Sequence, residues 1–199
     1  GFRLWNAETG RAAVMTAADV ETWRTQLQSV GQVSAFRSTT RNLISADGLS
    51  EKIDVAEMTA SGFDVARVAA HLGRTLAASD ELPGAPGVIV IAFDVWQTMF
   101  GGAPDVVGRA ARLGATPTTI VGVMPERFAF PIAHDAWVPL RMGTPDRTRR
   151  SDPAVGIVFG RLAQRATLSA AQAEVAVLGA RIAGEFPDTH ARVTPEVLP

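Results

Sequence analysis

Apolar residues recur at helical spacing near the start of the chain. Val20, Trp23 and Leu27 are three and four positions apart, which predicts a helix that buries one face and continues to a stop at Gly31. Residues 16–19, TAAD, form a capping box with its acidic residue in the first turn. We therefore expect the helix to begin there.

The next apolar residues fit strands and turns. Residues 33–44 carry Val, Phe, Thr and Ile in a β-prone mixture, and an Ala-Asp-Gly turn at 46–48 leads to a second strand at 52–58, so the simplest prediction is a hairpin. Residues 61–64 open a short helix or an irregular turn. The two prolines and two glycines within residues 78–87 predict an exposed loop.

The most continuous apolar run follows that loop. Residues 88–91, VIVI, have no polar alternation, which predicts a strand buried on both faces at the centre of a sheet. Asp94, with Gln97 three positions later, is expected to cap the helix that follows. Gly101 is suited to the left-handed position at the end of that helix.

The middle of the chain predicts a strand pair and then an irregular segment. Residues 110–113 and 118–124 flank a Gly-Ala-Thr-Pro turn at 114–117. After Pro125 neither a helical nor a strand period is visible, so we expect the aromatic residues there to hold an extended segment against the core. Those residues are Phe128, Phe130 and Trp137.

The C-terminal part predicts a strand, a helix and a strand. The strands are expected at residues 154–162 and 192–197, and Ser169 with Gln172 forms a second capping box before a helix that Pro187 terminates. One apolar face of that helix consists of Ala171, Val175, Leu178, Ile182 and Phe186.

These elements predict a mixed α/β (α+β) fold of two small α/β subdomains within one domain over residues 1–199. The main lobe is placed at 14–140 and the strand-helix-strand unit of the second lobe at 154–199. The polar residues 142–153 between them are interpreted as a linker.

Composition narrows the function classes. The net charge is -1 and the pI about 6.3, so no general attraction for phosphate backbones exists and nucleic-acid binding is disfavoured. The chain contains no Cys, which excludes disulfides, thiolate nucleophiles and Cys-based zinc sites. The longest apolar run, residues 88–93, is far shorter than the roughly 20 residues that cross a bilayer.

Groups able to perform chemistry are sparse. The three histidines, at 71, 134 and 190, occur in no metal-binding spacing such as HxH or HExxH, and His134 with Asp135 is the best of the weak metal or acid–base candidates. No GxSxG elbow or Walker-type loop is present, and Gly101, Gly102 and Gly108 are better explained by backbone turns than by a phosphate cradle. We therefore predict no catalytic, cofactor-binding or metal-binding residues and no cofactor.

Two further sets of side chains have both a structural and a binding interpretation. The aromatic residues are expected to fill the core, with a ligand groove as the alternative. The arginines are expected to be solvated in a loop, with contact to an acidic partner or lipid headgroups as the alternative. The sets are Trp96, Phe128, Phe130 and Trp137, and Arg141, Arg147, Arg149 and Arg150.

Several stretches, in the same order, are similar to one known family. They are AADVETWRTQLQSVGQVSAF, GFDVARVAAHLGRTLAASDE, GVIVIAFDVWQTMFGG, TIVGVMPERFAFP and GRLAQRATLSAAQAE. Together they resemble the MacB-like periplasmic core domain of ABC-transporter permeases, in particular the ADOP-type permeases, over nearly the whole chain from Asp19 to Val197. The chain departs from the family pattern at turns and caps, as at Ala92 and at residues 164–166.

The resemblance implies a non-catalytic domain on the periplasmic side of the bacterial inner membrane. It would lie between two membrane helices of the same permease and couple ATP-driven motion to export or to substrate extraction. The implied partners are those helices, an ATPase domain or subunit, and a periplasmic adaptor or substrate. A dimer is implied in the intact transporter, and any ATPase activity lies outside this segment.

Two alternatives from other classes stay open. One is a periplasmic binding module for a peptide, lipid or protein partner, which an open aromatic cleft or a large exposed apolar patch would favour. The other is a hydrolase that uses His134 and Asp135, which would need a closed pocket with converging ionisable groups.

Overall fold

The computed structural model describes residues 1–142 and 155–199, which form two compact units. Unit 1 consists of Gly1–Phe36 together with the described residues of Met142–Pro199, and unit 2 of Arg37–Arg141. The sequence-based lobe at 14–140 differs from this division, because residues 14–36 belong with the C-terminal segment. The predicted linker at 142–153 lies outside the described residues except for Met142.

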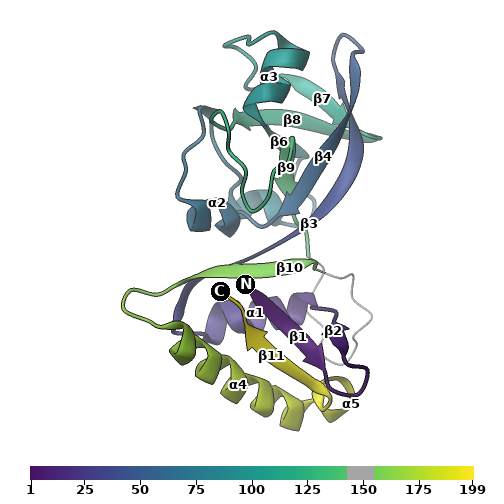
Figure 1. Cartoon of the computed structure of the whole chain (residues 1–199). Coiled ribbons are helices and arrows are strands. Elements are labelled where there is room, and N and C mark those ends of the chain that lie inside the picture. The colour runs from purple at the N-terminus through teal and green to yellow at the C-terminus, as the bar shows by residue number, and fades with distance from the viewer. Residues whose placement is uncertain (143–154) are drawn as a thin grey trace. The chain divides into compact units, whose positions relative to one another are not determined.

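Unit 1 is an antiparallel sheet with helices packed against it (Figure 1). Strand β1 pairs with β11, with β10 and with β2, and β10 pairs with the first part of β3, which continues into unit 2. The strands are β1 (Phe2–Asn6), β2 (Arg11–Ala13), β3 (Val30–Ser45), β10 (Ile157–Leu162) and β11 (Val193–Val197).

The first helix, α1 (Ala17–Gln26), begins as the sequence predicts and ends earlier. Thr16 accepts a hydrogen bond from the backbone N–H of Asp19, and the Asp19 carboxylate accepts from the N–H of Thr16, which completes the capping box. The helix ends at Gln26 and not at Gly31, since β3 already begins at Val30. Trp23 is 2% exposed, with its ring centroid 5.0 Å from that of Phe2, so α1 packs on β1.

The long helix α4 (Leu168–Glu185) buries the predicted face, with Ala171, Val175, Leu178 and Ile182 inside and Phe186 half-buried just beyond its end. The predicted Ser169 cap is wrong: Thr167 has the extended backbone of an N-cap and accepts from the N–H of Ala170 at 3.1 Å. Pro187 opens the short helix α5 (Pro187–His190), as expected of a residue that ends the preceding helix.

Unit 2 is built on strands that close into a ring. The pairings run β3–β4–β9–β6–β8–β7 and return to β3, and β5 pairs with the last residues of β8, beyond those that pair with β7. The β4–β9 and β6–β8 pairs are parallel and the β6–β9 pair is antiparallel. The strands are β4 (Ser50–Met58), β5 (Leu72–Gly73), β6 (Val88–Ile91), β7 (Ala110–Leu113), β8 (Thr116–Val123) and β9 (Ala136–Pro139).

The core of unit 2 fills this ring. Alternate residues on each strand belong to one buried cluster, such as Ile53 and Val55 on β4 and Leu43 on β3, as interior positions of a small barrel require. Helix α3 (Phe93–Phe100) contributes Val95, Trp96 and Met99 to the same cluster. The predicted hairpin and the fully buried strand β6 are confirmed.

Two expectations for unit 2 are wrong. The N-cap of α3 is Ala92, without a side-chain cap, so Asp94 lies in the first turn and does not cap it; Gly101 ends the helix with φ 60° as predicted. Trp137, expected in an irregular segment, lies in strand β9, whose four residues are too few to show a period. The short helices are α2 (Ser61–Ala66) and the 3-10 turn η1 (Ala78–Glu81), which lies in the predicted loop.

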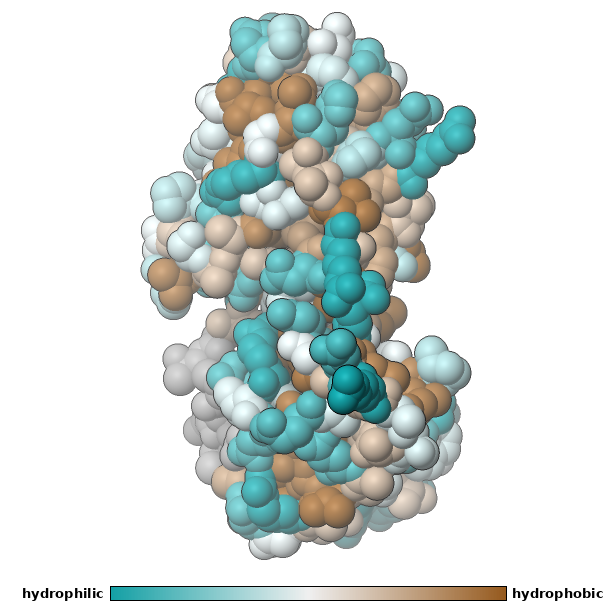
Figure 2. All heavy atoms as spheres, turned by 90° about the vertical axis from the view of Figure 1, so that its left-hand side faces the viewer, coloured by the Kyte–Doolittle hydropathy of each residue, from teal (hydrophilic) through white to brown (hydrophobic). Residues whose placement is uncertain are grey.

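The mixed α/β class predicted from the sequence is confirmed. On the face drawn in Figure 2, hydrophobic residues form patches scattered among hydrophilic ones, as is usual for a protein surface. No helix in the described ranges is long and apolar enough to cross a membrane.

Candidate functional site

The two ends of the chain lie side by side in unit 1 (Figure 1). The amino group of Gly1 donates to the carbonyl of Leu198 at 2.6 Å, and the N–H of Leu198 donates to the carbonyl of Gly1 at 2.7 Å. From there β1 and β11 stay paired through five residues, from Phe2 opposite Val197 to Asn6 opposite Val193. The two ends therefore belong to one hydrogen-bonded element.

Side chains strengthen this paired element. The Arg3 guanidinium contacts the Glu196 carboxylate at 2.5 Å across the two strands. On β11, Pro195 packs against α4 so closely that a Cβ on Gly179 would lie 2.5 Å from the proline ring. Glycine at this helical position allows the close contact between β11 and α4.

A buried polar network joins α5 to the start of α1. His190 Nε2 lies 3.0 Å from Asp19 Oδ1, and Asp19 Oδ2 accepts from the backbone N–H and the hydroxyl of Thr16 at 2.9 Å. Both His190 and Asp19 are buried. His190 is thus part of the contact between α5 and α1, and its role here is structural.

Helix α4 is also tied to the segment after α1. The Glu174 carboxylate accepts from the backbone N–H groups of Gln28 at 2.7 Å and Ser29 at 2.8 Å, and from the Ser29 hydroxyl. Burial raises the pKa of Glu174, but the hydrogen bonds outweigh it and hold the pKa below its ordinary value of 4.5. Sequence reasoning missed this contact, which joins residues 145 positions apart.

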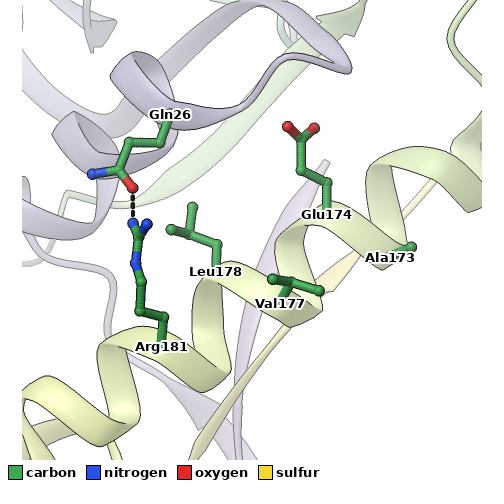
Figure 3. Close-up of a pocket in the computed structure, with 6 residues that line it drawn as sticks. All are labelled: Gln26, Ala173, Glu174, Val177, Leu178 and Arg181. Atoms are coloured by element: carbon green, nitrogen blue, oxygen red, sulfur yellow. Dashed lines mark hydrogen bonds between the residues drawn. The ribbon is translucent and has the colours of Figure 1, made fainter.

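A groove of about 640 Å³ lies in unit 1 between the end of α1 and the middle of α4 (Figure 3). Arg181 of α4 reaches across and donates a hydrogen bond to the side-chain oxygen of Gln26 on α1. Leu178 and Val177 lie beside this pair, and Val177 is 73% exposed. The groove offers apolar surface with a polar rim, and among the described residues no acid, base or nucleophile beyond Glu174 lines it.

His134 and Asp135 have different hydrogen-bond partners. His134 is buried, with Nε2 2.8 Å from the Ser38 hydroxyl and Nδ1 3.1 Å from the Ile132 carbonyl. The Asp135 carboxylate instead accepts from the backbone N–H of Asp54 at 2.8 Å. A serine does lie near the imidazole, yet the side chain that follows in sequence does not orient it, so the pair forms no Ser-His-Asp arrangement.

The other candidate side chains are mainly structural. Trp137 is fully buried and its indole N–H donates to the Phe130 carbonyl at 3.1 Å, and Phe128 packs on it edge to face at 5.1 Å. His71 is exposed and packs against the ring of Trp96 at 5.5 Å. The predicted core role of these aromatic residues agrees with their packing.

The predicted arginine set and the predicted turn glycines are placed only in part. The Arg141 guanidinium donates to the carbonyls of Asp80, Ala85 and Pro86, whereas the three further arginines lie outside the described residues. Gly101, Gly102 and Gly108 all have positive φ, as turns require. No three His, Asp or Glu side chains in the described ranges gather as a metal site would need.

A sequence model of the family described as MacB-like periplasmic core domain matches residues 2–178. A search of curated protein sequences found no match. Two of the similar solved structures have transporter titles. One is the extracellular domain of the noncanonic ABC-type transporter YknZ from Gram-positive bacteria, with a TM-score of 0.68 and 15% identity over 99% of this chain and 100% of that chain. The other is the periplasmic region of MacB from Actinobacillus actinomycetemcomitans, with a TM-score of 0.69 and 13% identity over 98% of this chain and 86% of that chain.

A third similar structure is a domain of a putative permease protein from Porphyromonas gingivalis. Its TM-score is 0.71 and its identity 13%, over 100% of this chain and 88% of that chain. At such low identities the likeness to solved structures shows the fold alone.

Proposed function

Since the chain belongs to the MacB-like periplasmic core domain family, and so is the periplasmic domain of an ABC-transporter permease, we propose that it transmits force and catalyses no reaction. Displacements of the neighbouring membrane helices would enter unit 1 through β1 and β11. Movement of the two units would then couple the nucleotide state of the ATPase to export or to substrate extraction.

The observation that carries this proposal is the pairing of Gly1 with Leu198 and of the strands that follow. Two helices attached to one antiparallel pair cannot move that pair apart without breaking its hydrogen bonds. They therefore move it as one body, and α4 moves with it through the contact of Gly179 with Pro195. A close-packed interior transmits such displacements because it is hard to compress.

Flexible insertions test this coupling in the reconstituted permease. Gly/Ser segments of about six residues, placed on the membrane side of both β1 and β11, behave as random coils and should absorb the displacement. ATP hydrolysis should persist, while the nucleotide-dependent signal of a fluorophore on Val177→Cys should disappear. The same insertion at Gly48, in the exposed turn between β3 and β4, is the control and should leave the signal intact.

A signal that survives both membrane-side insertions would contradict force transmission through these strands. Dimerisation in the intact transporter, an ATPase partner and a periplasmic adaptor or substrate belong to the same proposal and follow from the family. The proposal needs no catalytic residue in this domain.

The second candidate function is a periplasmic binding module, which the groove of Figure 3 favours because Val177 is 73% exposed beside a polar rim. An apolar fluorescent dye should then bind the parent protein and lose its binding to Val177→Asp, while the unfolding temperature stays unchanged. Absence of saturable dye binding to the parent would contradict a binding role for this groove.

A further inference from the structure

A second pocket, of about 250 Å³, lies entirely within unit 2. It lies where inward-facing positions of the ring strands extend past the apolar core. Glu57 follows Ile53 and Val55 on the inward side of β4, and Thr118 precedes Ile120 on the inward side of β8. Polar side chains at such positions line the mouth of a small barrel, which is a common place for a ligand site.

A buried carboxylate organises the wall of this pocket. Glu57 is 7% exposed and its Oε2 accepts from Arg37 Nε at 2.6 Å, while its Oε1 accepts from Arg41 Nη2. Burying a carboxylate is costly unless it is paired, so both guanidinium groups are drawn to this spot. Arg37 and Arg41 are four positions apart on β3 and therefore face the same side of the strand.

Positive charge exceeds negative charge here. Arg141 also lines the pocket, and its guanidinium donates hydrogen bonds to neutral carbonyl groups. Asp80, whose carbonyl accepts from Arg141, has its carboxylate paired with Arg74 at 2.6 and 3.0 Å. Among the described residues that line the pocket there are therefore three arginines and one carboxylate, which leaves two positive charges.

The Thr118 hydroxyl is the second, independent observation. Thr118 lines the pocket, its Oγ1 is buried, and this oxygen has no hydrogen-bond partner among the described residues. Buried hydroxyl groups almost always have a partner, and leaving one without it is destabilising. Such a hydroxyl beside three guanidinium groups is suited to donate to an anionic oxygen.

We propose that this pocket binds a small ligand through a dianionic phosphate group, either inorganic phosphate or a phosphate monoester. Guanidinium groups match the planar, two-oxygen recognition of phosphate, and a charge of about -2 on a monoester near neutral pH balances the excess positive charge. Arg37 and Arg41, oriented by Glu57, hold two of its oxygens, and Thr118 donates to a third. This site does not depend on the force-transmitting role proposed above.

Phosphate titrations of the 199-residue chain at low ionic strength, followed by ³¹P NMR and calorimetry, test the site. Inorganic phosphate and glycerol phosphate should bind saturably with one site per chain, and chloride at matched ionic strength should not compete. Arg41→Gln should weaken binding at least tenfold. Arg127→Gln, at a side chain that is 90% exposed and outside the pocket, is the matched control and should bind as the parent does.

Thr118→Val separates ligand recognition from folding. Without phosphate this variant should unfold at the same temperature as the parent or higher, since it removes a hydroxyl that lacks a partner. With phosphate its gain in unfolding temperature should be clearly smaller than that of the parent. If Arg41→Gln failed to fold, this variant alone would decide the matter.

Three results would overturn the proposal. One is the absence of saturable phosphate binding, and another is equal weakening by Arg127→Gln and Arg41→Gln, which would mean diffuse charge attraction. The third is binding to phosphatidylglycerol vesicles without binding to either soluble phosphate, because the lipid phosphodiester carries a single charge and the site would then serve a membrane surface.

Discussion

Unit 1 and unit 2 are assembled from the chain in opposite ways. Unit 2 is one continuous segment, Arg37–Arg141, whose strands close into a ring around a core of its own. Unit 1 is made of the two outer segments, joined by contacts such as the one between Gly1 and Leu198. The stability of unit 2 therefore depends on contacts within one segment, whereas that of unit 1 depends on the contacts that hold its two segments together. This difference is why the proposed force transmission assigns the sensing of displacement to unit 1.

The largest expected effects come from two buried tryptophans, one in each unit. Trp137→Ala should lower the stability of unit 2, and Trp23→Ala that of unit 1, by about 3–5 kcal/mol each, because each leaves a large cavity in a closed core. Hydrogen exchange measured for each unit should show faster exchange mainly in the unit that carries the substitution. Equal acceleration in both units by either variant would show that the units form a single cooperative core.

A smaller loss is expected at the polar network of unit 1. Asp19→Asn should cost about 1–3 kcal/mol, because His190 and the start of α1 lose a buried charged acceptor. Asp188→Asn, at an exposed position in the first turn of α5, is the matched control and should change stability by less than about 0.5 kcal/mol. Similar losses for both variants in urea unfolding would refute the importance of the buried network.

Acid should weaken both units through one carboxylate in each. The Arg74 guanidinium holds the pKa of Asp80 below its ordinary value of 3.8, and hydrogen bonds from Ser29 and Gln28 lower that of Glu174 despite its burial. A pKa depressed in the folded state means that the stabilisation is complete above the unfolded value, and is lost as the pH falls through the folded value.

Variants that lack these carboxylates should therefore lose less stability as the pH falls. Asp80→Asn should reduce the pH dependence of unit 2 below about pH 4, and Glu174→Gln that of unit 1 below about pH 4.5, with losses near neutral pH of about 1–2 kcal/mol. Hydrogen exchange at several pH values measures this in each unit separately. If the stability of either variant depended on acidic pH as strongly as that of the parent, another group would control the acid sensitivity of that unit.

The smallest effect is expected at the surface of the paired ends. Arg3→Gln removes the ion pair with Glu196, whose partners are 41% and 35% exposed, so the loss should be about 0–1 kcal/mol and should vanish in high salt. Thermal unfolding at low and high ionic strength is the measurement. A loss above about 2 kcal/mol would mean that this pair, and not the backbone hydrogen bonds, holds the two ends together.

Elements with a local signal could be predicted from the sequence, and long-range pairings could not. The capping box at Thr16 and the buried run of β6 depend on neighbouring residues, and both predictions are confirmed. The ring closure by β7 and the contact of Glu174 with Ser29 join distant segments, for which a single sequence contains no local pattern. The same limit applies to the pocket, since Glu57 and Thr118 are ordinary strand residues until the strands are assembled.

The most direct test of force transmission is a distance measurement in the intact, reconstituted permease. Spin labels on Val177→Cys and Leu82→Cys report across the two units, and labels on Val177→Cys and Ile157→Cys report within unit 1; this chain has no cysteine of its own and all three positions are exposed. We predict that trapping the ATP-bound state changes the distance between the units while the distance within unit 1 stays constant. Identical distances across the units in the nucleotide-free and ATP-trapped states would contradict it.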